Sequence, residues 1–415
     1  MPMNILQLSP RFPYPLIDGG AVGVFKITEC VAALGHKITF ATYPDPEINI
    51  TEAAKIAMSA FCDLQLTPTP LPSMKSVLLR TIFRGAYPIE RRMMPEMFEL
   101  IERLMSENMF DIVHIDHAHM GKYGLWIKER YKIPVVLREH NYETLIYERF
   151  AANAKNSFKK IVASVHAKRL RAEEARFIQG VDAVIPITLK DEALMRKDSP
   201  DAVYYTIPAG VDIDYYKPQP ELETENNILW IGGVNWLPNR DAVEFFVKEI
   251  FPLVVKAFPK VTFDIVGDST DTLQPLAQQW ADKIRLHGRV PDIRPFVGQA
   301  TVLVCPLRVG GGMRLKLLDF FASGKAVVST HIGAEGNLAR DGEEFLLRDD
   351  AVSFANAVIE LLRNPELRYQ LDTNARSLAL REYSWESVGK RFCDVYEKVI
   401  SQRNDDNQHI DHSTR

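Results

Sequence analysis

The amino-acid sequence predicts an α/β protein of two doubly wound domains, and three observations lead to this fold class. Short apolar runs alternate with longer helical patterns, which is typical of parallel strands joined by helices. The alternation begins again near Asn227, with a second opening strand and a second pair of glycines. The chain has 415 residues, more than one ordinary hydrophobic core accommodates.

In the first half, an apolar run at residues 4–8 predicts the opening strand, and residues 19–34 have the pattern of a helix. Further β-branched runs predict strands at residues 37–41, 112–115, 134–137 and 183–186. Residues 93–105 and 161–177 have long amphipathic patterns. We expect these two helices to pack around the N-terminal sheet.

The second half repeats this pattern, with strands expected at residues 227–231, 261–266, 300–305 and 326–329. Residues 208–220, rich in Pro, Asp and Tyr, have the turn chemistry of a linker. We therefore expect domains at residues 1–212 and 213–382. A helix should follow at residues 383–400, and the polar tail at residues 401–415 should be disordered.

Composition excludes several classes of protein. Lys and Arg number 50 against 54 Asp and Glu, so the basic excess of a nucleic-acid-binding protein is absent. The four cysteines lie far apart without a CxxC pair, which argues against a zinc site or a disulfide scaffold. No apolar run approaches the roughly 18 residues that cross a bilayer, and residues 1–10 are not a secretory signal. The simplest expectation is a cytoplasmic protein.

The strongest local signal is a glycine triplet, Gly310, Gly311 and Gly312, before a helix expected from about residue 314. Backbone N–H groups at a helix N-terminus form an anion site. Arg314 and Lys316 add positive charge in the first turn, where it disfavours the helix itself. A bound anion explains this placement, and the alternative is a flexible surface loop with solvated cations.

Two known phosphate motifs do not fit the sequence. Gly324 and Lys325 are followed by Ala326 and lack the earlier glycine of a P-loop. Gly19 and Gly20 do not extend into a G-x-G-x-x-G pattern. The sequence therefore supports neither an ATPase nor a standard dinucleotide enzyme, and it leaves a diphosphate ligand held by glycines, Arg and Lys.

Several weak motifs occur in a specific order along nearly the whole chain, at residues 13–20, 111–114, 138–141, 208–212, 233–239, 288–292, 310–324 and 333–336. In this order and spacing the chain resembles GT-B glycosyltransferases, most closely family 4 (glycosyl transferases group 1). The resemblance implies two Rossmann-like domains facing an interdomain cleft, with the C-terminal helix crossing back to the first domain. It also implies transfer of a sugar from a UDP- or GDP-sugar, with retention and without a metal or cofactor.

The chain departs from the family pattern at two places. The family's E-x7-E pair falls on Gly311 and Asp319, so the first acid is missing. Many members carry Arg and Lys after the first strand of the second domain, but residues 232–239 contain no cation. We expect Arg314 and Lys316 to take over the neutralisation of the donor diphosphate.

The resemblance assigns further donor contacts. Gly19 and Gly20 would approach the diphosphate from the first domain, although a plain tight turn also explains them. Asp319, at the second acid position, would bind the nucleotide ribose; otherwise it is a helix-surface carboxylate. Asn235 and Arg289 lie in matching stretches and are expected to bind the donor.

The family often contacts the reacting sugar with a His after the strand at residues 112–115. Its second His falls on Asp116, and we favour His117, with Asp116 and His119 as rivals. Each of these histidines, and His114, also fits an ordinary structural role. Glu139, His140 and Asn141 follow the next strand and are expected to bind acceptor or donor sugar.

A run of basic residues predicts a surface contact. Lysines and arginines at residues 155–171, with Arg80, Arg84, Arg91 and Arg92 nearby in sequence, fit a helix on anionic lipid or a solvated face. We expect a peripheral contact at the inner face of the membrane, and a glycan or lipid-linked acceptor. The alternative functions are an epimerase on the same fold and a non-catalytic nucleotide-sugar-binding protein.

Overall fold

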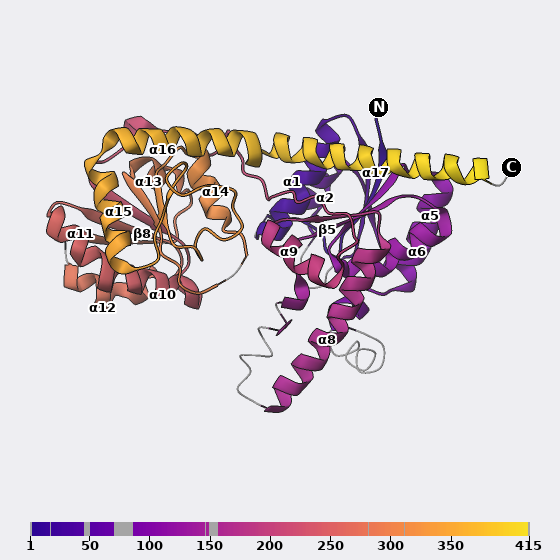
Figure 1. Cartoon of the computed structure of the whole chain (residues 1–415), viewed down its shortest axis with the longest axis horizontal. Coiled ribbons are helices and arrows are strands. Elements are labelled where there is room, and N and C mark those ends of the chain that lie inside the picture. Colours follow the sequence, from indigo (N-terminus) through magenta and orange to yellow (C-terminus); the bar gives the residue numbers. More distant parts are fainter. Residues whose placement is uncertain are drawn as a thin grey trace. The chain divides into compact units, whose positions relative to one another are not determined.

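The structure, a computed structural model, describes residues 2–16, 18–44, 50–69, 86–145, 147–148, 157–280, 282–310 and 312–413. The chain forms two compact units (Figure 1). Unit 1 comprises Met1–Pro208 and Val388–Arg415, and unit 2 comprises Ala209–Ser387. The sequence places the boundary four residues later than the structure does. Residues 209–212 belong to unit 2 because Val211 N donates to Tyr383 O at 2.7 Å and Gly210 packs on the Trp385 ring.

Unit 1 contains a parallel six-stranded sheet of order β3-β2-β1-β4-β5-β6. Its strands are β1 (Asn4–Leu8), β2 (Lys37–Thr42), β3 (Asp63–Leu66), β4 (Ile112–Asp116), β5 (Val135–Glu139) and β6 (Ala183–Pro186). The order reverses direction between β1 and β4, and ligands of doubly wound sheets bind outside the carboxyl ends of the strands at such a point.

Unit 2 repeats this topology, with strand order β12-β11-β10-β7-β8-β9. Its strands are β7 (Asn227–Ile231), β8 (Thr262–Val266), β9 (Ile284–Gly288), β10 (Val302–Cys305), β11 (Val327–Ser329) and β12 (Leu346–Leu347). The reversal lies between β7 and β10. The predicted fold class, two doubly wound parallel sheets, is confirmed.

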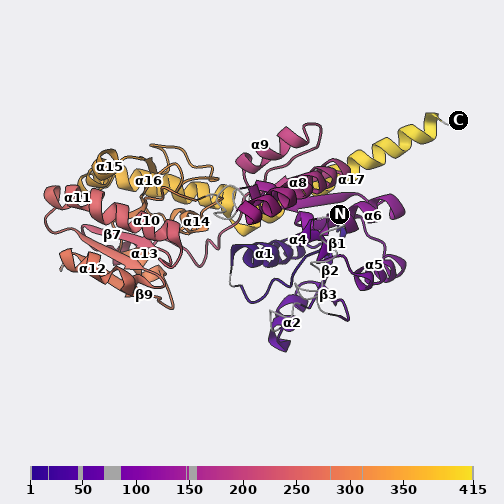
Figure 2. The same ribbon diagram turned by 90° about the horizontal axis from the view of Figure 1, so that it is seen from below.

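Helices cover both faces of each sheet (Figures 1 and 2). In unit 1 they are α1 (Gly19–Ala33), α2 (Glu52–Ser59), α4 (Tyr87–Glu90), α5 (Pro95–Glu107), α6 (Gly121–Tyr131), α8 (Ser157–Gly180) and α9 (Leu189–Asp198). In unit 2 they are α10 (Leu237–Phe245), α11 (Phe251–Ala257), α12 (Gln274–Ala277), α13 (Arg294–Gln299), α14 (Leu315–Ala322), α15 (Ala351–Arg363) and α16 (Pro365–Leu378). Side-chain N-caps fix several of their starts, including Asp18, Thr188 and Asp350.

The C-terminal helix α17 (Trp385–Ser413) begins in unit 2 and continues as part of unit 1. Inside unit 1 it packs closely on α1, where a Cβ on Gly389 would lie 2.9 Å from Cys30 Cβ. The helix extends to Ser413, whereas the sequence predicts disorder from Ser401. Extending an existing helix by further polar turns costs little compared with nucleating one, which accounts for this difference.

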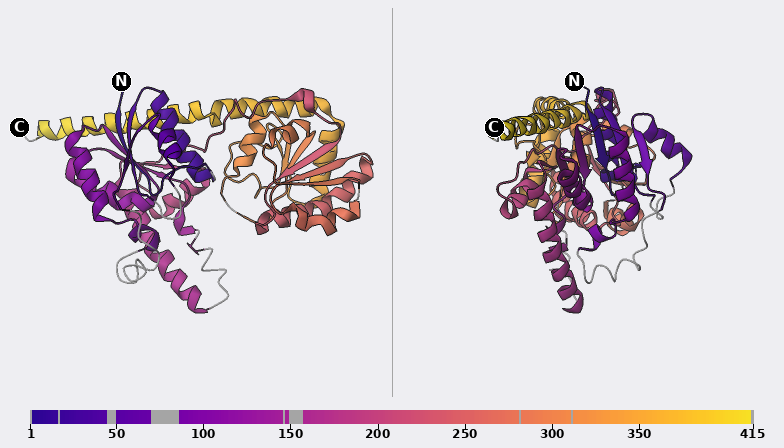
Figure 3. Two further views of the ribbon diagram at one scale, coloured as in Figure 1. Left: turned by 180° about the vertical axis from the view of Figure 1, so that it is seen from behind. Right: turned by 90° about the vertical axis from the view of Figure 1, so that its right-hand side faces the viewer.

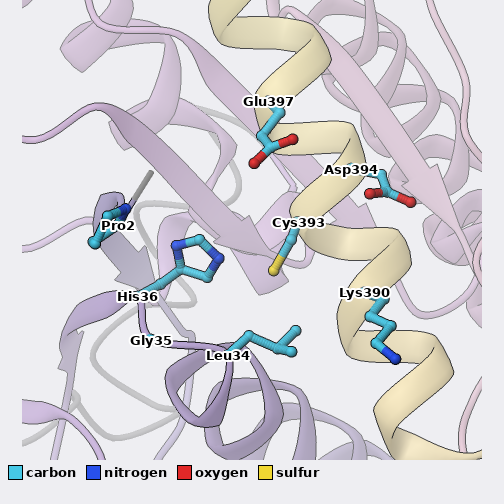
Figure 4. Close-up of a pocket in the computed structure, with 8 residues that line it drawn as sticks. All are labelled: Pro2, Leu34, Gly35, His36, Lys390, Cys393, Asp394 and Glu397. Atoms are coloured by element: carbon cyan, nitrogen blue, oxygen red, sulfur yellow. The ribbon is translucent and has the colours of Figure 1, made fainter.

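Two pockets of unit 1 lie at the amino ends of its strands. One, of about 420 Å³, is enclosed by the α1–β2 turn and α17, with His36, Cys393, Asp394 and Glu397 in its wall (Figure 4). The other, of about 720 Å³, lies along β2, β3 and the end of α5. Neither contains a residue that the sequence singles out for function. Among the described residues, no helix combines the length and apolarity that a membrane span requires.

Candidate active site

The loop between β10 and α14 carries the predicted anion site. Gly310 has φ 139° and Gly312 has φ 82°, backbone conformations that residues with a Cβ rarely adopt. Gly311 lies outside the described residues. A Cβ on Gly310 would lie 2.2 Å from Arg314 Nη2, so the missing side chain makes room for the guanidinium.

Arg314 and Lys316 converge on the reversal point between β7 and β10. The Lys316 ammonium donates to Ile231 O, the last carbonyl of β7, at 3.0 Å and lies 5.0 Å from the Trp230 ring centroid. The Arg314 guanidinium lies 5.3 Å from the ring centroid of Trp236. Arg314 and Lys316, carried by α14, thus lie beside the cation-free loop at residues 232–239.

Neither cation is neutralised by a carboxylate hydrogen bond among the described residues. Arg314 Nε and Nη2 are buried and have no hydrogen-bond partner there. Burial lowers the pKa of Arg314 and of Lys316, with partial compensation for Arg314 from Cys305 and Glu335. Two desolvated positive charges, one of them with unpartnered donors, are an arrangement that an anion stabilises.

The other predicted donor residues of unit 2 lie along the same edge of the sheet. Asn235 is exposed in the loop after β7. Arg289 follows β9, is 84% exposed, and lies 3.9 Å from Asp268. Asp319 is partly buried in α14; burial raises its pKa to about 7, and a hydrogen bond from Tyr216 opposes the shift.

In unit 1, His117 follows β4 directly and has an unusual backbone. Its φ is 65°, the left-handed region, and its N–H donates to Arg138 O at 2.8 Å, extending the ladder between β4 and β5. Non-glycine residues in this region are uncommon and concentrate at functional sites.

Three imidazoles form a stack. The His117 ring lies 3.8 Å from that of His140 and 5.5 Å from that of His119. Burial lowers the pKa of all three below the usual histidine value, in the case of His140 to about 4. Neighbouring positive groups add to the effect: the other two histidines for His117, Arg92 and His140 for His119, and Arg138 for His140. These side chains are therefore neutral near pH 7, and His117 Nδ1 and His119 Nε2 have no partner among the described residues.

Asp116 lies beneath this stack at the centre of a buried network, defined here as Gln7, His114, Asp116, Arg138 and His140. Gln7 Nε2 donates to Asp116 Oδ2 at 2.7 Å, and Arg138 Nη1 donates to Oδ1 at 3.3 Å. Burial opposes ionisation of Asp116, but His114, His140 and Arg138 hold its pKa well below the usual value. Asp116 is 0% exposed, so its carboxylate contacts the network and not the solvent.

The acceptor-side candidates differ in burial: Glu139 is buried, whereas Asn141 is exposed. Glu139 ends β5, is 0% exposed, accepts from Ala118 N, and leaves Oε1 unpartnered among the described residues. Burial raises its pKa well above the usual value, and the nearby carboxylates of Glu174 and Glu143 raise it further. Asn141 is exposed.

The two donor-side glycines of unit 1, Gly19 and Gly20, are the first residues of α1. Asp18 caps this helix and pairs with Arg11.

Sequence reasoning missed Arg138, Gln7 and Tyr396 as parts of the site. Arg138 was noticed only within a motif, yet it is 2% exposed inside β5. A charged residue within a buried strand is almost always paired, so the Arg138 that follows Val135–Leu137 is a usable signal. Tyr396, whose hydroxyl lies 2.5 Å from His114 Nδ1, carried no such signal because it lies 282 residues away.

The depressed pKa of His119 predicts a loss of stability in acid. In the unfolded chain this group takes up a proton near pH 6.5, whereas the folded chain does not. Its contribution should therefore fall as the pH drops below 6.5, by at most about 1.4 kcal/mol per pH unit. Urea unfolding of wild type and His119→Gln between pH 7.5 and 4.5 measures this as a shrinking difference between the two.

The exposed His331, which pairs with Asp349, provides the control. Glu139 and Glu174 have raised pKa values and therefore increase the stability of the folded protein as the pH falls. Comparing each variant with wild type cancels this opposite contribution. A difference between wild type and His119→Gln that stays constant over this pH range would contradict the prediction.

Two sequence families match the chain. Glycosyltransferase Family 4 matches residues 17–215, and Glycosyl transferases group 1 matches residues 225–364. A phosphatidyl-myo-inositol mannosyltransferase of Mycobacterium leprae is 24% identical over 408 residues, covering 96% of this chain and 98% of that protein.

Solved structures share the fold. The sucrose-phosphate synthase of Thermosynechococcus elongatus superimposes with a TM-score of 0.69 at 17% identity, covering 96% of this chain and 100% of that one. HepE of Anabaena, solved with UDP and glucose, superimposes with a TM-score of 0.61 at 13% identity, covering 95% and 100%. At these identities the likeness concerns the fold alone.

Proposed function

Because the chain belongs to glycosyltransferase family 4, whose members transfer sugars from nucleotide donors, we propose that it moves a sugar from a UDP- or GDP-sugar to a glycan or lipid-linked acceptor. The proposal includes retention of anomeric configuration and no requirement for a metal. The observation that carries it is the pair Arg314 and Lys316, two cations without a carboxylate hydrogen bond among the described residues, beside the glycine loop at the reversal point of unit 2.

The proposed chemistry uses this pair where charge develops. When the bond between the sugar and the diphosphate breaks, the leaving nucleoside diphosphate gains negative charge. Preorganised donors at that position stabilise the transition state more than the ground state. The Arg314 guanidinium and Lys316 ammonium are held over indole rings, so they are oriented without being neutralised.

We propose the remaining roles from the site geometry. Asp319, with Tyr216 as hydrogen-bond donor, binds the ribose, and Asn235 and Arg289 bind other parts of the donor. His117, neutral and partly exposed, contacts the transferring sugar, while Asp116 supports the histidines from below. Glu139, His140 and Asn141 lie on the acceptor side of unit 1. The mannosyltransferase relative, which is named for phosphatidyl-myo-inositol, supports a lipid acceptor.

Thermal-shift titration with UDP, GDP and ADP, followed by turnover assays, tests the proposed function. A ligand at 100 times its Kd stabilises the folded state by about 2.7 kcal/mol, so the preferred nucleotide is identified directly. A transferase releases free nucleotide when an acceptor is added. An isomerised donor without nucleotide release indicates the epimerase, and binding without any turnover indicates a non-catalytic protein.

We predict that transfer does not require a divalent metal, since Arg314 and Lys316 already supply positive charge at the diphosphate. The described residues contain no group of three or more His, Cys, Asp or Glu side chains suited to holding a metal ion. Turnover should be unchanged in EDTA and after addition of manganese. Loss of activity in EDTA with recovery in manganese would refute the prediction.

We also predict that α8 binds anionic membrane. Its first half extends beyond the body of unit 1 (Figures 1 and 3), and it exposes Ile161 and Val165, one turn apart, between the exposed Lys160 and Lys168. The predicted basic residues Lys155, Arg80 and Arg84 lie outside the described residues. Each cation near an anionic surface contributes about 1 kcal/mol.

Flotation with anionic and neutral vesicles measures this contact. The protein should float with the anionic vesicles only, and salt should release it. Lys160→Ala/Lys168→Ala should weaken flotation, whereas the matched pair Lys256→Ala/Lys260→Ala in unit 2 should not. Equal recovery from both vesicle types would exclude an electrostatic membrane contact.

A further inference from the structure

Inside unit 1, the helix α17 contacts the buried network directly. We propose that Tyr396 of α17 is a positioning residue, whose hydroxyl fixes the His114 ring against Asp116 and so holds His140 and His117 in their working orientation. The last step, in which His117 meets a sugar, rests on the proposed function. The preceding steps concern the folded protein alone.

Two aromatic side chains of α17 reach the network. The Tyr396 hydroxyl lies 2.5 Å from His114 Nδ1, and both residues are 1% exposed. Phe392, one turn earlier, stacks on the His114 ring at 5.7 Å with an interplanar angle of 10°. The Arg138 guanidinium lies 5.9 Å from the centre of the same phenyl ring. Helix α17 therefore closes the network on one side.

The chemistry of these groups selects one tautomer of His114. Its Nε2 has no hydrogen-bond partner among the described residues and lies 3.5 Å from Asp116 Oδ1, where the ionised carboxylate favours an N–H over a lone pair. Nδ1 is then the lone-pair nitrogen and needs a donor. Burial raises the pKa of Tyr396 well above its usual value, so the hydroxyl keeps its proton and donates to Nδ1.

Further contacts of Asp116 fix the orientation of His140 and, through it, of His117. Arg138 Nη1 contacts both Asp116 Oδ1, at 3.3 Å, and His140 Nε2, at 2.8 Å. Because a guanidinium only donates, His140 Nε2 accepts, and the His140 ring is fixed. His117 stacks on that ring at 3.8 Å. A change at His114 thus acts on Asp116 through a charge contact, then on His140 through the hydrogen bonds of Arg138, and on His117 through ring stacking.

Docking of α17 does not in itself require this polar contact. The helix also buries Val388, Val395 and Val399 against unit 1, each no more than 4% exposed. A buried hydroxyl and imidazole cost desolvation free energy that an apolar pair avoids, and a fully connected network gains orientation in return. The Tyr396–His114 hydrogen bond is thus better explained by positioning than by packing.

The test begins with the full-length protein without substrate, labelled with ¹⁵N-histidine. Nitrogen shifts of the His114 ring report its tautomer, and we expect the Nε2–H form in wild type. Tyr396→Phe should yield a mixture of tautomers and shift the ring signals of His140 and His117. Tyr204→Phe, which removes another buried hydroxyl of unit 1 whose acceptor is Ser199 O, should leave all three unchanged.

The kinetic measurement uses the nucleotide sugar whose nucleotide stabilises the protein in the thermal-shift titration. Tyr396→Phe should lower kcat by about tenfold, the scale of one disrupted buried hydrogen bond. Affinity for UDP or GDP, whichever stabilises wild type, should stay within about twofold, because that site belongs to unit 2. Tyr204→Phe should retain wild-type kcat.

The outcomes separate the two proposals. Unchanged histidine spectra in Tyr396→Phe, with only a lower melting temperature, would reduce Tyr396 to a packing role and overturn the inference. Altered spectra with unchanged kcat would also overturn it. Absence of turnover in wild type overturns the proposed function, and the spectra alone then decide whether Tyr396 positions the network.

A second variant tests the inference if Tyr396→Phe folds poorly. Phe392→Leu removes the ring that stacks on His114 but leaves the hydroxyl of Tyr396 in place. We expect altered ring shifts for His114 with the Nε2–H tautomer retained. A change of tautomer in Phe392→Leu would show that the hydroxyl does not set it.

Discussion

Arg314→Ala should lose about 2–4 kcal/mol of transition-state stabilisation, which slows sugar transfer by roughly 30- to 900-fold. The variant removes a guanidinium that lies over Trp236 and has two donors without partners among the described residues. Because those donors are free to meet the charge of the leaving diphosphate, kcat/KM should fall while the fold is retained. Steady-state kinetics with the preferred nucleotide sugar measure the effect.

The same loop offers a matched control. Arg308 is also an arginine after β10, but its guanidinium pairs with Asp241 at 2.7 Å and approaches Glu249 at 3.7 Å. Arg308→Ala should retain nearly wild-type kcat/KM. Lys316→Met, which preserves much of the side-chain volume, should resemble Arg314→Ala. Wild-type turnover in Arg314→Ala, or an equal loss in Arg308→Ala, would rule out the assigned diphosphate site.

His117→Ala should lower kcat far more than it weakens binding of the free nucleoside diphosphate. A neutral imidazole that hydrogen-bonds the sugar helps to hold it in reactive geometry, and this contribution appears in the rate. The diphosphate contacts lie in unit 2 and should persist. Turnover assays and calorimetric titration with the nucleoside diphosphate separate the two quantities.

Three companion variants make this test specific. His117→Asn keeps a residue that tolerates a left-handed backbone, so it separates loss of the imidazole from backbone strain. Asp116→Asn should lower kcat through disorder of the network, and His119→Ala should have the smallest effect. If His117→Ala retains wild-type kcat while His119→Ala loses it, the sugar contact belongs to His119. If no variant matters, the non-catalytic alternative gains support.

The sequence predicted the buried strands well because their side chains are apolar on both faces. It missed β3, β9 and β12, which lie at or beside sheet edges. β9 alternates buried and exposed residues among Arg and His, and β12 has only two residues, so neither has the apolar run of a central strand. Edge strands are defined by their neighbours more than by their own composition.

The candidate site was predictable where one short segment carries it. The glycine loop, Arg314 and Lys316 lie within seven residues of sequence, and they were recognised together. The contact of Lys316 with Ile231 O joins residues 85 apart, and no local pattern indicates it. Likewise, the sequence ranked Asp116 as a rival of His117, and only burial of its carboxylate among His114, His140 and Arg138 separates their roles.

Helix α17 also determines when the protein can finish folding during its synthesis. Unit 1 is built from the first 208 residues and a segment that begins at Val388, so its final element leaves the ribosome after the whole of unit 2. Until then, the face that receives Phe392 and Tyr396 is uncovered, with His114 exposed to solvent or to a chaperone. Unit 2, which is continuous in sequence, is completed first, although its synthesis starts second.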